Sequence, residues 1–226
     1  YSERYDEGIY VGYRYFDTFG VSPRIPFGFG LSYTTFSIRA SVFGMYGSQI
    51  RFEAAVTNTG KMPGKEVVQA YCRCPSGKLD KESCRLCDFA KTKRLNPGES
   101  CTVMLTVDMA DLWSYDEETG CRLLEKGSYL FTIGNSSLDR KPVAEVLLDE
   151  DAVISKLCRI MPDAPTDSLH SPSAPERIDC KSIQAFALSS KEIDKYVPSY
   201  EKKPLRKDIQ ACVDSLSLEQ LCRLTN

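Results

Sequence analysis

The sequence contains a single histidine and no long run of apolar residues. With only His170 available, this chain alone cannot supply a triad or a metal centre that needs several imidazoles, so we interpret His170 as a solvated loop residue. No segment approaches the roughly 18 consecutive apolar residues that a membrane-spanning helix requires. We therefore expect no membrane partner.

An excess of charge of either sign is also absent. The 29 Lys and Arg residues nearly balance the 31 Asp and Glu residues, and the two signs are interspersed. Such a chain has no long-range field that would gather nucleic acid. It has neither a P-loop nor a dinucleotide-binding glycine pattern, because Gly28-x-Gly30 is too short for both. We expect no nucleic-acid partner and no cofactor.

Cysteine, in contrast, is plentiful, and its ten residues are an even number that would suit a disulfide framework in a secreted protein. Disulfide-dense scaffolds are mostly much shorter chains, whereas 226 residues with 42% hydrophobic content can support a core by burial alone. We therefore favour reduced thiols and a cytoplasmic location. Because the chain starts at Tyr1 and not at a methionine, we expect the natural N-terminus to lie upstream.

Alternation of apolar and polar residues dominates between residues 35 and 148 and predicts a two-sheet antiparallel sandwich. Ile50, Phe52, Ala54 and Val56, for example, fall on one face of a single strand. Turn signals from Gly, Pro and Asn separate seven predicted strands. These strands cover residues 36–42, 50–56, 66–74, 84–95, 101–107, 128–134 and 143–148, and a short helical turn is predicted at 109–113.

The composition changes after the predicted sandwich. Residues 162–175, PDAPTDSLHSPSAP, are rich in Pro, Ser and Asp and bury too little to fold, so they predict a linker. Residues 176–204 have scattered apolar positions that could lie along a neighbouring domain. Helices are predicted at 190–196 and 205–226, and Ser217 with Gln220 forms a capping-box pattern in the second.

Several sequence motifs occur in a fixed order along the chain. The stretch EGIYVGYRY at residues 7–15 is followed by PFGFGLSYT at 26–34. These two stretches resemble the end of the α/β sandwich domain of family 3 glycoside hydrolases and its entry into a fibronectin type III-like module. Within the module, VTNTG at 56–60, GKEVVQ at 64–69 and LNPGES at 95–100 continue the resemblance. So do EKGSY at 125–129 and IGNSS at 133–137.

The resemblance implies a mainly β chain in which a fibronectin type III-like, immunoglobulin-like antiparallel β-sandwich has an irregular N-terminal segment and a helical C-terminal tail. Residues 1–34 would end the α/β sandwich domain, 35–150 would form the module, and 151–204 would be a linker and interdomain segment. Residues 205–226 would open the (β/α)8 barrel, with LSLEQL at 216–221 in its first helix. That order implies a circularly permuted family member.

The same resemblance implies a parent enzyme that hydrolyses terminal, non-reducing β-D-glucosyl or related residues with retention of configuration. Retaining glycosidases use two carboxyl groups about 5 Å apart, and in the family these lie outside the matched stretches. We therefore assign no catalytic residue, interpret Glu3, Asp6 and Glu7 as solvated or structural, and expect this fragment to be inactive. The expected partners are the neighbouring α/β sandwich and barrel domains, the parent's oligosaccharide substrate and a second subunit.

Two alternative functions stay open. The first is an independent carbohydrate-binding or protein-interaction module, in which aromatic residues would form a sugar-stacking platform, although packing between sheets is the favoured role for them. The candidate residues of that platform are Tyr10, Tyr13, Tyr15, Phe16, Phe27 and Phe29.

The glycosylation triplet at Asn135 is expected to be unmodified.

The second alternative is a zinc-stabilised interaction module. Cys72-x-Cys74 and Cys84-x-x-Cys87 are the zinc candidates, because four thiolates in two close pairs can surround a tetrahedral Zn²⁺. The competing interpretation is that these are small buried side chains, since Cys72 and Cys74 share a strand face with Val68. We favour buried thiols and expect no metal.

Overall fold

The computed structural model describes residues 7–30, 32–157, 169–170, 183–193, 215 and 217. The chain divides into two units, Tyr1–Tyr196 and Val197–Asn226, and every helix and strand reported below lies in the first. The helix predicted at 205–226 therefore falls almost entirely outside the described residues. Within the described part, no helix has the length and apolar character needed to cross a bilayer.

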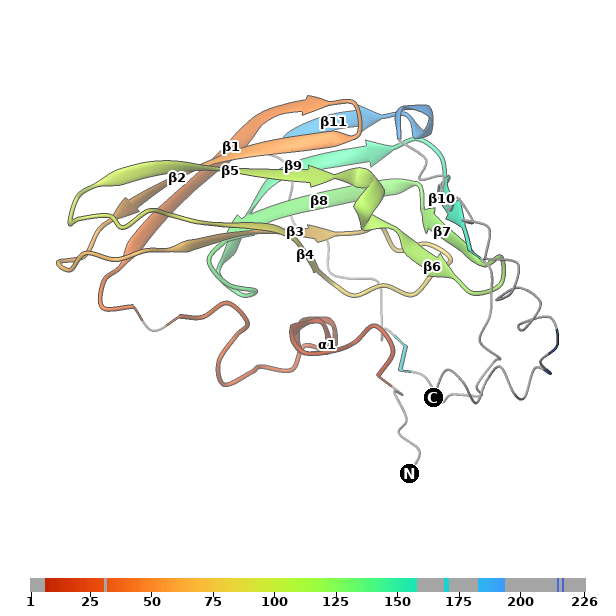
Figure 1. Cartoon of the computed structure of the whole chain (residues 1–226), viewed down its shortest axis with the longest axis horizontal. Helices are drawn as coiled ribbons and strands as arrows, with labels where there is room; N and C mark the ends of the chain where they lie inside the picture. Colours follow the sequence, from red (N-terminus) through yellow and green to blue (C-terminus); the bar gives the residue numbers. More distant parts are fainter. Residues whose placement is uncertain are drawn as a thin grey trace. The chain divides into compact units, whose positions relative to one another are not determined.

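The first layer of the fold is a three-stranded antiparallel sheet (Figure 1). It contains β1 (Phe36–Tyr46), β2 (Gln49–Asn58) and β5 (Ser100–Asp108), in the order β1-β2-β5. Gly47, in the left-handed conformation at φ 57°, allows the tight turn between β1 and β2. Alternate residues of β2 are buried, which is the pattern of a strand with one face on a core.

The second layer is a five-stranded sheet in the order β11-β9-β8-β3-β4. Its strands are β3 (Val67–Arg73), β4 (Arg85–Lys91), β8 (Gly127–Gly134), β9 (Arg140–Leu148) and β11 (Gln184–Leu188). All neighbours are antiparallel except β11, which pairs in parallel with β9.

A small third sheet closes one end of the sandwich. It has the order β10-β7-β6 and contains β6 (Ser114–Asp116), β7 (Cys121–Leu124) and β10 (Ala152–Lys156). The 3₁₀ turn η1 (Met109–Leu112) leads into it from β5, and the Asp108 side chain caps that turn by accepting from the Ala110 N–H at 3.0 Å. A second 3₁₀ turn, η2 (Ser190–Glu192), follows β11.

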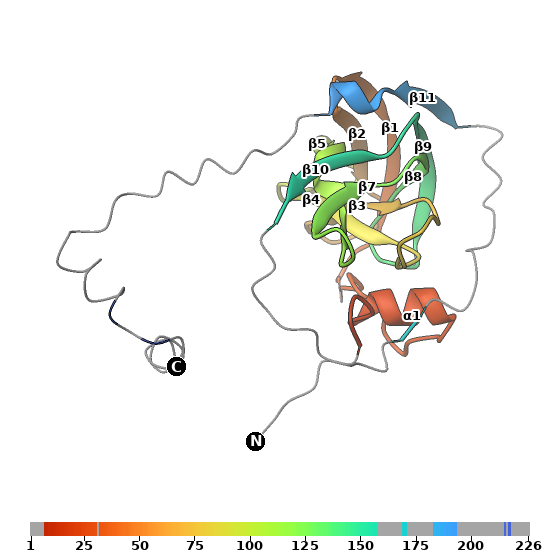
Figure 2. The ribbon, with the colours of Figure 1, turned by 90° about the vertical axis from the view of Figure 1, so that its right-hand side faces the viewer.

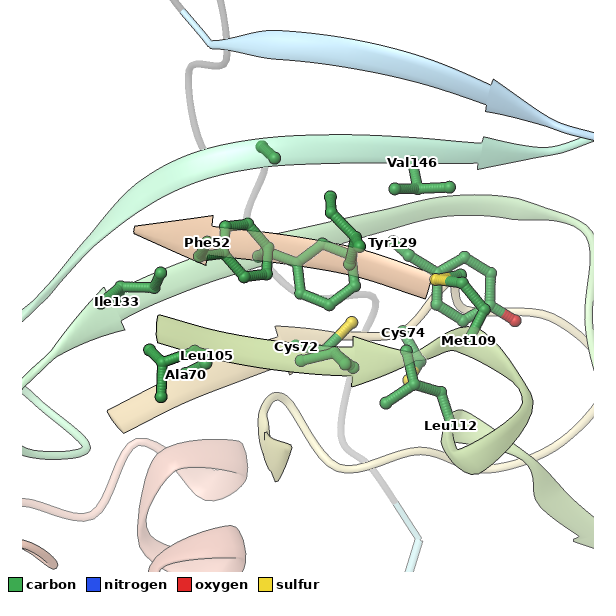
Figure 3. Close-up of a cluster of buried hydrophobic side chains, with 14 of the residues drawn as sticks. Phe52, Ala70, Cys72, Cys74, Leu105, Met109, Leu112, Tyr129, Ile133 and Val146 are labelled. Atoms are coloured by element: carbon green, nitrogen blue, oxygen red, sulfur yellow. The ribbon is translucent and has the colours of Figure 1, made fainter. Parts of the chain in front are cut away.

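The hydrophobic core lies between the two larger sheets. Phe52 from β2 and Phe131 from β8 are fully buried, with ring centroids 5.4 Å apart. Figure 3 shows Phe52 and Leu105 from the first sheet facing Ala70, Tyr129 and Ile133 from the second. The predicted mainly β, fibronectin type III-like sandwich is therefore confirmed.

All seven predicted strands are present, as β1, β2, β3, β4, β5, β8 and β9, and the predicted turn at 109–113 is η1. Four further strands, β6, β7, β10 and β11, were not predicted. Two of them, β10 and β11, lie in the range assigned to the linker and interdomain segment, and β11 completes an edge of the main sheet. Asp149 holds the chain after β11 by accepting from the Ser190 N–H at 2.7 Å and the Ser189 hydroxyl at 2.9 Å.

The N-terminal segment was expected to be irregular but contains the helix α1 (Tyr13–Phe19), which Figure 2 shows outside the two sheets. Gly12 and Gly20, both with positive φ, bound the helix. Its aromatic residues contact one another, with Tyr15 and Phe19 stacked at 4.9 Å in the i, i+4 relation. No residue of α1 is fully buried, so its position depends on contacts other than a deep apolar face.

Asn58, at the end of β2, is fully buried and connects three segments. Its Oδ1 accepts from the Thr34 hydroxyl at 2.6 Å and from the Gly60 N–H at 3.1 Å. Its Nδ2 donates to the Met62 and Leu95 carbonyls at 2.8 and 2.9 Å. The amide therefore uses both ends to fix the entry into β1, the turn after β2 and the strand-like bridge at Leu95.

We expect Asn58→Ala to lower the free energy of unfolding by about 2–4 kcal/mol, because it leaves buried carbonyl and hydroxyl groups without partners. Urea unfolding measures the change. Asn96→Ala is the matched control, since Asn96 is exposed and hydrogen-bonds only to nearby Glu99 in the contacts described, and it should change stability by less than about 0.5 kcal/mol. Equal effects of the two variants would contradict this role for Asn58.

Candidate functional site

A pocket of about 840 Å³ lies between the N-terminal segment and the connection from β3 to β4. One wall comes from residues 16–23, which include the second half of α1, and the other comes from residues 73–83. Arg140 at the start of β9, Leu138 and His170 complete the lining. Sequence reasoning placed no site here, because these segments are far apart along the chain.

Glu125, directly after β7, holds the wall formed by residues 76–82. Its Oε1 accepts from the backbone N–H of Lys78 at 2.5 Å and of Leu79 at 3.2 Å. Its Oε2 forms an ion pair with Lys81, and both side chains are about 95% buried. Gly77 leaves the space that this carboxylate needs, because a side chain there would collide with Glu125. The loop is thus shaped around one buried carboxylate.

Asp17, in the last turn of α1, lines the floor of the pocket with Arg140 and contacts Cys84 behind it. Its Oδ2 accepts from the Cys84 thiol at 3.0 Å and from Arg140 Nη2 at 3.4 Å. Burial raises the pKa of Cys84 to about 12, so the thiol stays protonated and can donate. The Arg140 guanidinium also lies over the ring of Tyr71, 5.2 Å from its centroid.

Glu82 is the second carboxylate at the floor, with a side chain only 2% exposed. It accepts from Arg85 Nε at 2.5 Å, and Arg14 Nε lies 3.9 Å away. Burial acts to raise the pKa of Glu82, but the hydrogen bond and charge of Arg85 outweigh it and hold that pKa below its ordinary value. Glu82 is therefore ionised at neutral pH.

Further polar contacts attach the N-terminal segment to the sandwich. The Leu86 N–H, in β4, donates to the Tyr13 hydroxyl at 2.8 Å, and the Ser83 N–H donates to the Thr18 hydroxyl at 2.9 Å. The Ser137 N–H donates to the Phe27 carbonyl at 2.8 Å. Together with Asp17, these contacts fix residues 13–27 against β4 and the turn before β9.

Comparison with known proteins decides the family. Residues 66–137 match the family model described as the fibronectin type III-like domain. β-Glucosidase A of Butyrivibrio fibrisolvens is 37% identical over 220 residues, which cover 88% of this chain and 26% of that protein. A β-glucosidase of Ruminococcus albus is 42% identical over 159 residues, or 68% of this chain and 17% of that protein.

Solved structures agree. A β-glucosidase from Paenibacillus barengoltzii is 38% identical, with a TM-score of 0.64, over 69% of this chain and 18% of that one. The GH3 β-glucosidase of Bifidobacterium adolescentis is 33% identical, with a TM-score of 0.59, over 68% of this chain and 23% of that one. This chain is a fibronectin type III-like region of the kind that family 3 β-glucosidases contain. It spans about a quarter or less of the length of these relatives.

The four zinc candidates of the fibronectin type III-like region do not form one four-thiol cluster. The Cys84 thiol donates to Asp17 and the Cys87 thiol donates to the Arg85 carbonyl, whereas Cys72 and Cys74 are buried in the hydrophobic core. In the described part of the chain, no three His, Cys, Asp or Glu residues are placed to hold one metal ion. The six described cysteines are free thiols, and the other four lie outside the described residues.

The remaining candidates of the sequence analysis are dispersed. His170 is exposed as expected, but it lines the pocket and its Nδ1 lies 3.1 Å from Asp80 Oδ2. Glu7 is exposed in a turn, and Glu3 and Asp6 lie outside the described residues. Of the proposed aromatic platform, Tyr10 is buried and Tyr13 stacks on Phe27 at 4.9 Å, which is packing within the segment.

We expect Glu125→Gln to lower the free energy of unfolding of the fibronectin type III-like region by about 3 kcal/mol, because it leaves the Lys81 ammonium buried without its counter-charge. Urea unfolding measures this loss. Glu118→Gln is the matched control: Glu118 also pairs with a lysine of the same loop, but its side chain is 76% exposed, so little change is expected. A similar small change in both variants would show that the buried pair does not hold the loop.

The lowered pKa of Glu82 predicts that the stability of the folded chain decreases in acid. Because folding lowers its pKa from an ordinary value of 4.5, its contribution to stability is fully present above that value and is lost as pH falls through the folded-state pKa. We expect Glu82→Gln to be less stable than the unmodified chain at pH 7 and the gap to narrow below about pH 4.5. Unfolding curves from pH 3 to 8 test this, and a gap independent of pH would contradict it.

Proposed function

We propose that this chain is a non-catalytic, structural region of a longer family 3 β-glucosidase and that it fixes the end of the preceding α/β sandwich domain against the fibronectin type III-like sandwich. The observation that carries the proposal is the Asp17–Arg140 ion pair, formed by side chains only 4% and 15% exposed. One partner lies in the N-terminal segment and the other in the sandwich. Such an ion pair fixes the relative position of two parts of the polypeptide and takes part in no reaction.

The exposed side chains of the N-terminal segment support the same role, because several of them are apolar. Val11, Ile25, Phe27, Phe29 and Tyr33 are all about half exposed or more. Contiguous exposed apolar side chains are typical of surfaces that another part of a protein covers. The relatives are about four to six times longer than the matched region, so we propose that the rest of the α/β sandwich domain covers this segment.

For the longer protein we propose hydrolysis of terminal β-D-glucosyl residues with retention, through two carboxylates outside this chain. The match to the Butyrivibrio fibrisolvens enzyme covers 88% of this chain, against 68% for the Ruminococcus albus enzyme. That longer match supports the proposal that a barrel follows residue 204 in a permuted order.

The free thiols of the described cysteines support a cytoplasmic location. Contact with a second subunit is proposed as an additional role.

The decisive experiment is on the longer protein. We expect Arg140→Ala there to lower the melting temperature and the activity on a chromogenic β-glucoside together, because Asp17 would be left buried and unpaired at a cost of about 3 kcal/mol. Arg39→Ala, on the exposed side of β1, is the control and should change neither. Full stability and activity in Arg140→Ala would refute the structural role.

The isolated chain provides a second test. We expect no hydrolysis of the same β-glucoside by residues 1–226, whereas the longer protein hydrolyses it. Release of chromogen by the isolated chain, at a rate that scales with its concentration, would place catalytic carboxylates inside this region.

A further inference from the structure

Basic side chains gather at the end of the sandwich where the loop between β2 and β3 meets the end of β4. Two segments carry them, and they pair with each other: Gly64 and Leu95 form an antiparallel bridge, and Val67 lies opposite Lys91. The backbone therefore holds these cations side by side. We call the group the basic strip, and it consists of five exposed residues, Lys61, Lys65, Lys91, Lys93 and Arg94.

The described residues around the basic strip do not neutralise it. Lys93 pairs with Glu99 at 2.8 Å, but the other four cations form no ion pair with a described residue. Glu66 directs its carboxylate elsewhere, since it accepts from the Val67 N–H at 2.9 Å and from the Asn135 amide at 3.4 Å. Like charges held together repel one another, so a negatively charged partner would stabilise this arrangement.

The basic strip adjoins the N-terminal segment. Thr34 packs against the loop after β2, and a Cβ atom on Gly60 or Gly64 would collide with its side chain. Each of these two glycines is followed directly by a lysine of the basic strip. Tyr33, the residue before Thr34, is 94% exposed. An exposed aromatic ring and two cations therefore lie on neighbouring backbone positions.

A second contact extends this surface along β3 and β4. Gly28 packs against the Gln69 side chain so closely that a Cβ atom on Gly28 would collide with it. Phe89 lies directly opposite Gln69, and such antiparallel pairs point to the same face of a sheet. Phe89 is 64% exposed and Phe29 is 57% exposed. Lys91, two residues after Phe89, is on the same face, so the aromatic side chains are bordered by positive charge.

We propose that this surface, exposed aromatic side chains bordered by the basic strip, docks an acidic surface of the rest of the α/β sandwich domain in the longer protein. This contact rests on the proposed function, in which that domain covers the exposed side of residues 7–34. It adds the sign of charge that the covering surface carries. An apolar centre with a charged rim is the common anatomy of contacts between proteins and between domains, and complementary rim charges set the orientation. Nucleic acid fits less well, because the whole chain has a net charge of −2.

The test compares one double charge reversal in the isolated chain and in the longer protein. Lys65→Glu with Lys91→Glu should leave the melting temperature of residues 1–226 nearly unchanged, because both side chains are exposed and unpaired there. In the longer protein we expect the same double variant to lower the melting temperature by about 2 °C or more. That loss should shrink in 1 M NaCl, where the Debye length is about 3 Å.

Arg39→Glu with Lys156→Glu is the matched control, since both residues are exposed cations outside this surface, and it should change neither protein. If the double reversal does not fold in the longer protein, Lys65→Gln with Lys91→Gln removes the charges without adding repulsion. It should give a smaller loss with the same salt dependence.

Four results would overturn the proposal. They are a neutral double variant in the longer protein, an equal loss in the isolated chain, a loss that salt does not reduce, and a smaller assembly in light scattering, which would assign the surface to a second subunit. None of these variants touches the Asp17–Arg140 pair, which stays intact in every arm. Failure here is therefore distinct from failure of the structural role, which Arg140→Ala tests.

Discussion

The ion pair between Asp17 and Arg140 is the constraint on which the rest of this structure depends. It joins residues 123 positions apart, is nearly buried and is shared with the Cys84 thiol. Buried ion pairs add little stability compared with well-packed apolar residues, but removing one partner is strongly destabilising. The pair therefore does little to drive association of the segment, and instead specifies where the segment lies. Misplacement of α1 would separate the two charges and remove the carboxylate partner of Arg140.

Glu125 has a similar role at the opposite wall of the pocket, where its buried carboxylate fixes the position of a loop. Loops normally lie at the surface because their backbone groups need water, yet Lys81 and Glu82 of this loop are buried. The Glu125 carboxylate replaces water for the Lys78 and Leu79 N–H groups, while Lys81 neutralises its charge. Both walls of the pocket thus depend on acidic residues that are distant in sequence from the groups they satisfy. The pocket is consequently a product of tertiary structure.

Because the pocket is formed by contacts between residues distant in sequence, the strands could be predicted from the sequence and the pocket could not. The alternation in Ile50, Phe52, Ala54 and Val56 is local, and strands of that length were predicted correctly. Strands β6 and β7 have three and four residues, too few for a periodic pattern, and β11 acquires its partner only through β9. The candidate site had no local signal at all. Glu125 belongs to a recognised family motif, but nothing near it in sequence indicates that it binds residues 78–81.

The helix α1 is the clearest case of structure imposed from outside the segment. Seven residues are too few for a stable isolated helix, and Tyr, Phe and Thr favour helix only weakly. α1 buries no residue fully, but the half-buried Tyr13 ring packs edge-on against Tyr71 of the sandwich, with ring centroids 5.9 Å apart. Polar contacts from Tyr13, Asp17 and Thr18 to the sandwich complete the attachment. The sandwich therefore acts as a template for the segment that precedes it, and any surface presented by that segment depends on the sandwich being folded.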